Sequence, residues 1–220
     1  WAPYCFRSFA RVAWYCPSMK RRRSSSARVS SAWAIQRDQL CPCGLLLSIS
    51  HKLLPAFDRT RRGDFSQRGL QGFDLQGKTM GIVGTGDIGY HVAKIARGFG
   101  MEVCAFDVKP DEDLADEPGF EYVDMDTLLG QSDVITLHVP ANEKTKHMLS
   151  HDEFEKMKDG VVIINAARGS VIDISAMMQA LADGKVQAAG LDVLTEEPVV
   201  REEAELLRTA FERKHNLEEL

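Results

Sequence analysis

Three glycines at a fixed spacing, Gly84, Gly86 and Gly89, have the arrangement of loops that hold phosphate groups. They follow a short apolar run, Thr79–Gly84, and precede a stretch whose apolar residues recur every three to four positions, which indicates a helix. In such a unit the first glycine permits a tight turn, the second lets the backbone approach a pyrophosphate, and the third lets the helix pack on the strand. The free N–H groups at the helix N-terminus attract the phosphate oxygens. We therefore predict a dinucleotide-binding loop, and a plain turn is the weaker interpretation.

An acidic residue, Asp107, ends the next predicted strand, 18 residues after Gly89. At this position a carboxylate can accept hydrogen bonds from the hydroxyls of an adenosine ribose. Its charge would repel a 2′-phosphate, so the sequence favours NAD over NADP. Lys109 lies close enough to weaken that preference, and a surface aspartate without a role is the alternative.

Charged residues also follow two later strands. Arg168 comes directly after Val161–Asn165, and a guanidinium can bind a 2-oxo acid carboxylate in a fork and stabilise charge on the carbonyl oxygen during hydride transfer. On position alone, a solvated or structural arginine is the commoner assignment. After the last strand, one acid could bond the nicotinamide amide and another could orient a catalytic imidazole. Spacing does not choose among Asp192, Glu196 and Glu197.

An alternation of strands and helices must position these groups. The segments with the length and apolarity of strands are Thr79–Gly84, Glu102–Asp107, Phe120–Val123, Asp133–Val139, Val161–Asn165 and Val186–Val193. Helical patterns occur at Leu45–Leu54, after the glycine loop, around Leu128, after the capping box of Ser150 and Glu153, and after Asp173. Residues 58–77 are expected to form a loop or arm. The pattern predicts an α/β fold with a doubly wound parallel sheet, covered by helices on both faces.

Residues 1–44 differ from the rest of the chain. They carry eight Lys or Arg against a single acid, Asp38, and hold all three tryptophans and four of the five cysteines. An Arg- and Ser-rich transit segment, non-native sequence such as a misread start, and a genuine extension all remain open. The Cys41–Cys43 pair lacks the second close pair that a zinc site needs, so we expect no metal. We assign 45–220 to one dinucleotide-binding domain with a Rossmann core at 78–198.

The bulk composition excludes two kinds of partner. A formal net charge of −5 argues against a nucleic-acid binder. No apolar run approaches the roughly 20 residues of a membrane span. We expect a cytoplasmic protein, or an organellar one if residues 1–44 act as a transit segment.

Four segments in order, GIVGTGDIG, SDVITLHVP, MKDGVVIINAARGSVID and GLDVLTEEP, resemble the NAD-binding domain of the D-isomer-specific 2-hydroxyacid dehydrogenases. The resemblance extends from about Leu45 to Pro198, and the arm at 58–79 is similar to the D-lactate dehydrogenase branch. It implies an oxidoreductase that transfers a hydride between NAD(H) and a small 2-hydroxy or 2-oxo acid, working as a homodimer. An NAD-sensing corepressor of the same superfamily is the alternative. A methyltransferase is disfavoured by the motifs around Arg168 and Glu197.

The resemblance also assigns roles to residues. Arg168 would be the substrate-binding catalytic arginine, and Glu197 the carboxylate that pairs with a catalytic histidine. The residues that would line the NAD site are Gly84, Gly86, Asp87, Ile88, Gly89, Asp107, Val139, Pro140, Thr145, Ala166, Ala167 and Asp192.

Two features depart from the family pattern. The family's catalytic histidine follows the glutamate, with Pro before it and a small residue two positions later. Only His215 follows Glu197 here, and its neighbours do not match, so we do not assign it. Residues 1–44 are too short and too basic for the family's substrate-binding domain. We therefore expect a fragment that binds the cofactor and has negligible turnover alone.

Overall fold

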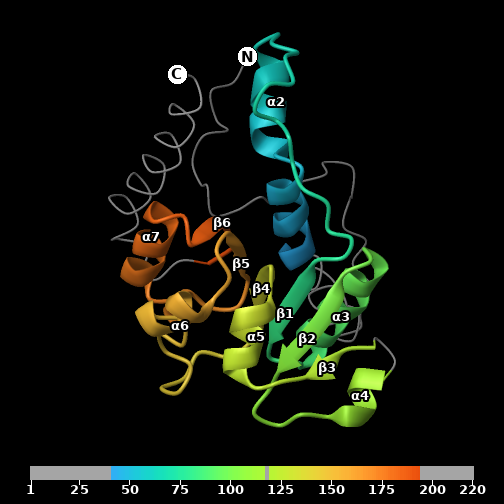
Figure 1. Cartoon of the computed structure of the whole chain (residues 1–220), viewed down its shortest axis with the longest axis vertical. Helices are drawn as coiled ribbons and strands as arrows, with labels where there is room; N and C mark the ends of the chain where they lie inside the picture. The colour runs from blue at the N-terminus through green and yellow to red at the C-terminus, as the bar shows by residue number, and fades with distance from the viewer. Residues whose placement is uncertain (1–40, 117–118, 194–220) are drawn as a thin grey trace, which may run out of the picture.

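The computed structural model describes residues 41–116 and 119–193, and its centre is one parallel sheet (Figure 1). The strands are β1 Thr79–Val83, β2 Glu102–Phe106, β3 Glu121–Tyr122, β4 Val134–Leu137, β5 Val161–Asn165 and β6 Val186–Leu191. They lie in the order β3-β2-β1-β4-β5-β6, and every neighbouring pair is parallel. The chain runs outward from β1 through β2 to β3, then returns to the other side of β1 at β4 and continues outward to β6. This is the Rossmann-like, doubly wound α/β fold, and the predicted fold class is confirmed.

Helices cover both faces of this sheet (Figure 1). Besides a helix over residues 41–50, the helices of the described chain are α3 Asp87–Gly98, α4 Glu112–Asp116, α5 Met125–Gln131, α6 His151–Lys156 and α7 Ile174–Ala182, together with α2 Leu53–Arg61, which lies off the sheet. The 41–50 helix and α3 pack on the face that carries Ile82 and Val134. Helices α5, α6 and α7 pack on the opposite face, against Val83 and Ile135. Adjacent strand residues thus enter different cores, which is why the strands are apolar throughout.

The predicted single helix Leu45–Leu54 is wrong. One helix covers residues 41–50 and a second, α2, begins at Leu53, in a region that the sequence assigned partly to a loop. Pro55 explains the break, because in a continuous helix its ring would clash with the carbonyl of His51. In the first turn of α2 the same proline is tolerated, since the N–H that it lacks has no helical partner there. Lys52 makes the bend with a left-handed backbone, at φ 49°.

Helix α2 extends beyond the sheet at one end of the molecule and buries none of its residues (Figure 1). Its apolar side chains Leu54 and Phe57 are 57% and 62% exposed, and Phe65, in the following arm, is 79% exposed. Two further elements, α4 and a 3₁₀ turn at Gly169–Val171, were not predicted, since both are shorter than two helical turns. No helix in the described part of the chain is both long and apolar enough to cross a membrane.

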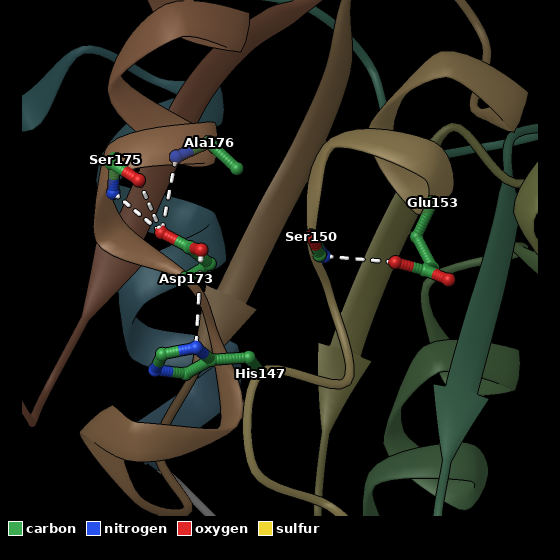
Figure 2. A network of polar contacts seen from close by, with 6 residues as sticks. All are labelled: His147, Ser150, Glu153, Asp173, Ser175 and Ala176. Carbon is green, nitrogen blue, oxygen red and sulfur yellow. Dashed lines mark hydrogen bonds and ion pairs between the residues drawn. The ribbon is translucent and has the colours of Figure 1, made fainter.

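The predicted capping residues lie at the starts of α6 and α7. The Glu153 carboxylate accepts a hydrogen bond from the Ser150 backbone N–H at 3.0 Å, at the start of α6 (Figure 2). The Asp173 carboxylate accepts from the backbone N–H groups of Ser175 and Ala176 at 2.9 and 3.3 Å, at the start of α7. Each cap satisfies N–H groups that have no partner within the helix. The loops before α6 and α7 therefore end at fixed points.

Candidate cofactor and substrate site

The glycine loop joins β1 to α3 at the carboxyl edge of the sheet. Gly84 has φ 96°, and a Cβ on it would lie 2.8 Å from the carbonyl oxygen of His138. A Cβ on Gly89 would overlap the carbonyl oxygen of Gly84, so the helix lies directly against the loop. Gly86, at the start of α3, has nothing within 4 Å of its own Cβ position. The first and third glycines thus permit close packing within the protein, whereas the second faces open space.

Asp107, at the end of β2, is bound to this loop. Its Oδ2 accepts hydrogen bonds from the backbone N–H and the hydroxyl of Thr85 at 2.8 and 3.1 Å, and its Oδ1 accepts from the Lys109 N–H at 2.9 Å. Burial of the carboxyl raises its pKa, but the hydrogen bonds from Thr85 and Lys109 outweigh that effect, so the pKa of Asp107 lies below its ordinary value. The group is therefore a carboxylate at neutral pH.

A tyrosine from the neighbouring strand completes this network. The hydroxyl of Tyr122, in β3, lies 2.8 Å from the Thr85 hydroxyl. An ionised Asp107 can only accept, so the single hydroxyl proton of Thr85 points to it. Tyr122 must then be the donor to Thr85. The sequence interpretation did not include Thr85 or Tyr122, which are 37 positions apart.

The segment after β4 passes beside the glycine loop. The backbone N–H of His138 donates to the Val83 carbonyl at 2.8 Å. Burial lowers the pKa of His138 to about 4, and its Nε2 lies 2.9 Å from the Thr136 hydroxyl. The buried hydroxyl of Thr145 donates to the Pro140 carbonyl at 2.6 Å and so closes the loop on itself. His138 is therefore a neutral, structural group at physiological pH.

The turn after β5 carries the predicted arginine. Asn165, the last residue of β5, accepts at Oδ1 from the Ala167 N–H and donates from Nδ2 to the Arg168 carbonyl, both at 3.0 Å. The Arg168 side chain is exposed, and its Nη1 donates to the Ala167 carbonyl at 2.7 Å. Among residues 41–116 and 119–193, no carboxylate forms an ion pair with Arg168. Its guanidinium can therefore receive a ligand carboxylate without displacing a carboxylate of these described residues.

A short ladder of backbone hydrogen bonds holds the far side of this turn. The N–H of His147 donates to the Ser170 carbonyl at 2.9 Å, and Leu149 and Ile172 form an isolated parallel bridge. Figure 2 shows the His147 ring directed at Asp173, with Nδ1 3.8 Å from Oδ2. A hydrogen bond from the Ser175 hydroxyl keeps the pKa of Asp173 below its ordinary value. The loops after β4 and β5 are thus joined beside Arg168.

All of the predicted site residues that the structure describes lie at one edge of the sheet. Because the strands are parallel, their carboxyl ends meet there, and the loops after β1, β2, β4, β5 and β6 carry them. Asp87 and Ile88 form the first turn of α3. Asp192, after β6, is exposed, and its N–H donates to the Asn165 carbonyl at 2.9 Å. Glu197 and His215 lie outside the described residues.

The strand order, the glycine turn at the start of α3 and the acid at the end of β2 define a dinucleotide-binding Rossmann domain. Residues 43–212 match the model of the family "D-isomer specific 2-hydroxyacid dehydrogenase, NAD binding domain", and the chain belongs to this family. The predicted family is therefore confirmed.

Curated relatives and solved structures agree with this assignment. The chain is 46% identical over 156 residues to a hydroxypyruvate reductase of Thermotoga maritima, and 44% identical over 154 residues to a D-lactate dehydrogenase of Escherichia coli, in each case over 70% of this chain. It covers 50% and 46% of those proteins, so it spans about half the length of the curated relatives it matches.

Among solved structures, the apo form of the Escherichia coli D-lactate dehydrogenase superposes with a TM-score of 0.70 at 41% identity, covering 72% of this chain and 50% of that one. The Aquifex aeolicus D-lactate dehydrogenase, complexed with NAD and lactic acid, gives 0.72 at 38% identity, covering 77% and 51%.

Proposed function

We propose that this chain binds NAD(H) at the carboxyl edge of its sheet, as the cofactor-binding part of an oxidoreductase for small 2-hydroxy and 2-oxo acids. The observation that carries the proposal is the position of three groups at the ends of parallel strands. The glycine loop follows β1, ionised Asp107 follows β2, and Arg168, which forms no ion pair with a carboxylate of the described residues, follows β5. The relatives named above act on acids of this class.

The residues at this edge fit the cofactor. The open space at Gly86 lies at the N-terminus of α3, where N–H groups of the first turn, including those of Asp87 and Ile88, can bind a pyrophosphate. Asp107 presents a carboxylate suited to ribose hydroxyls. Val139, Pro140 and Thr145 would line one side of the site; Ala166, Ala167 and Asp192 would line the nicotinamide end. These are the residues that the resemblance to the family assigns to the NAD site.

Arg168 would bind and orient the acid. Its guanidinium can hold the substrate carboxylate in a fork and stabilise the charge that develops on the neighbouring oxygen. NAD, when bound, supplies or accepts the hydride. Glu197 would pair with the histidine that exchanges the proton. The histidines of the described residues all precede β6, so none of them lies after Glu197, where the resemblance expects that histidine.

Titration calorimetry on the 220-residue chain tests the proposal. We expect binding of NADH, weaker binding of NADPH and none of adenosylmethionine. In the same preparation, oxidation of NADH with pyruvate, glyoxylate or hydroxypyruvate should be negligible. Absence of NADH binding would contradict the cofactor role, whereas robust acid-dependent oxidation would contradict only the expected lack of turnover.

We also propose that the chain forms a homodimer through α2 and the arm that follows it. A cluster of exposed apolar side chains can mark an interaction site. Helix α2 carries Leu53, Leu54 and Phe57, all at least 49% exposed, and Phe65 follows in the arm. Sedimentation should show a dimer for the wild-type chain and a monomer for the Leu54→Ser/Phe57→Ser variant. Val108→Ser, which removes another exposed apolar side chain next to Asp107, is the matched control and should remain dimeric. A monomeric wild-type chain would refute the proposal.

A further inference from the structure

Asn165 is the only polar residue of β5, and it is 1% exposed. The four residues before it are apolar and enter the two cores, so the strand carries a primary amide to the end of a buried apolar segment. A buried amide is stable only where both its oxygen and its nitrogen find partners. The partners of the Asn165 side-chain amide lie in the turn that the proposed function assigns to the nicotinamide and substrate end.

Three hydrogen bonds make Asn165 the meeting point of these segments. Its side-chain oxygen accepts from the Ala167 N–H, and its side-chain nitrogen donates to the Arg168 carbonyl. Its backbone carbonyl accepts from the Asp192 N–H. One residue therefore fixes the turn before the arginine and the first residue after β6.

The chemistry of these contacts requires an amide. The turn presents an N–H and a carbonyl to the same side chain, so that side chain must both accept and donate. An aspartate has the same shape and can accept from the Ala167 N–H, but as a carboxylate it has no proton for the Arg168 carbonyl. A leucine makes neither bond. The two contacts can thus be separated by substitution.

The remainder of the turn is fixed independently. The ladder from His147 to Ser170 holds the residues after Arg168, while the network of Thr85 and Asp107 holds the adenosine end of the proposed site. The backbone of Arg168 is therefore held on both sides, and within the part of the chain that the structure describes no carboxylate pairs with its guanidinium. Loss of the Asn165 amide would loosen one end of the site and leave the other unchanged.

We propose that Asn165 is a positioning residue, whose amide holds the Ala166–Ala167–Arg168 turn in place to receive the nicotinamide and the substrate carboxylate. This inference rests on the proposed function, and it adds a residue to which that function gave no role. It predicts that loss of the Asn165 amide lowers the affinity only for ligands that reach this turn.

Comparison of NADH with ADP-ribose tests this inference, because ADP-ribose has the adenosine, the pyrophosphate and the second ribose but no nicotinamide. For Asn165→Asp we expect the affinity for NADH in titration calorimetry to fall about tenfold, the effect of one lost buried hydrogen bond. The affinity for ADP-ribose should stay within about twofold of the wild-type value, because this ligand does not reach the turn. Asn165→Leu should lower NADH affinity further. The matched control is Ser132→Ala, which removes a buried hydroxyl bonded to the Leu128 carbonyl before β4 and should change neither affinity.

Parallel losses for the two ligands in Asn165→Asp, or no loss for either, would overturn the inference and leave the proposed function intact. If the wild-type chain bound neither ligand, the proposed function would fail as well. If both Asn165 variants unfold, hydrogen exchange of the Ala167 N–H in the wild-type chain tests the inference instead. We expect NADH to slow this exchange more than saturating ADP-ribose does, and equal slowing would contradict the inference.

Discussion

A Gly86→Ala variant should fold like the wild-type chain and bind NADH at least about tenfold more weakly. The new methyl group meets nothing within 4 Å in the protein itself, so it creates no clash in the free chain. It would, however, occupy the space over the start of α3 that we assign to the pyrophosphate. Thermal denaturation and titration calorimetry on the same sample measure the two effects.

Gly89→Ala should, unlike Gly86→Ala, destabilise the fold itself. Its methyl group would overlap the Gly84 carbonyl oxygen, which belongs to the backbone and cannot rotate away. Alanine improves helix propensity by up to about 1 kcal/mol. The overlap forces α3 away from β1, and overpacking of this kind costs about 1–3 kcal/mol or more. We therefore expect a lower melting temperature together with weakened binding.

Gly98→Ala is the matched control for both variants. Gly98 is the last residue of α3, has no neighbour within 4 Å of its Cβ position and lies at the opposite end of the helix from the loop. It should keep the wild-type affinity. A Gly86→Ala variant with wild-type affinity would show that the cofactor does not approach the loop at this point.

The sequence was sufficient to predict the fold wherever local pattern and tertiary packing agree. Strand β5 has the predicted limits because an unbroken apolar run can be satisfied only between two helical layers. The cap at Asp173 follows from residue type and position alone. The break at His51–Lys52 is also encoded, in Pro55, but the apolar spacing alone predicts a continuous helix across it.

Only the residues that we propose to contact the ligands have a recognisable pattern in the sequence. A glycine loop and an acid after the next strand have a chemical signature in the sequence, whereas the groups that hold them do not. Tyr122 reaches Thr85 only because β3 lies next to β2 in the sheet, and no local pattern encodes that contact. Asn165 did carry a signal, a primary amide at the end of a buried apolar strand. Interpreting it required the positions of Ala167 and Arg168.

Asp107→Ala should weaken NADH binding by about tenfold to a hundredfold and bring the affinities for NADH and NADPH close together. Hydrogen bonds to a charged group contribute about 1.5–3 kcal/mol, and the ribose hydroxyls would lose this partner. The affinity for NADPH should rise in the variant, because the carboxylate that repels its 2′-phosphate is gone while Lys109 remains nearby. Calorimetry with both dinucleotides measures the ratio directly.

Asp107→Asn separates charge from hydrogen bonding. The amide oxygen can still accept one hydrogen bond, so NADH binding should fall less than in Asp107→Ala, whereas NADPH binding should improve similarly. Asp113→Ala is the matched control, because it removes one exposed negative charge from the neighbouring helix α4 and leaves the loop contacts intact. An unchanged NADH-to-NADPH ratio in both Asp107 variants would mean that this carboxylate does not face the ribose.

The pH dependence of the wild-type chain should report the same carboxylate. Its pKa in the folded state lies below the ordinary value of 3.8, so ionised Asp107 contributes stability that is present above pH 3.8 and is lost as the pH falls through the folded-state pKa. NADH affinity should decline in the same range, since a protonated Asp107 is a poorer acceptor for the ribose. Asp107→Asn has no such group to titrate, so its affinity should change less with acid. If the two chains lost affinity in parallel below pH 4, the acid effect would arise elsewhere in the domain.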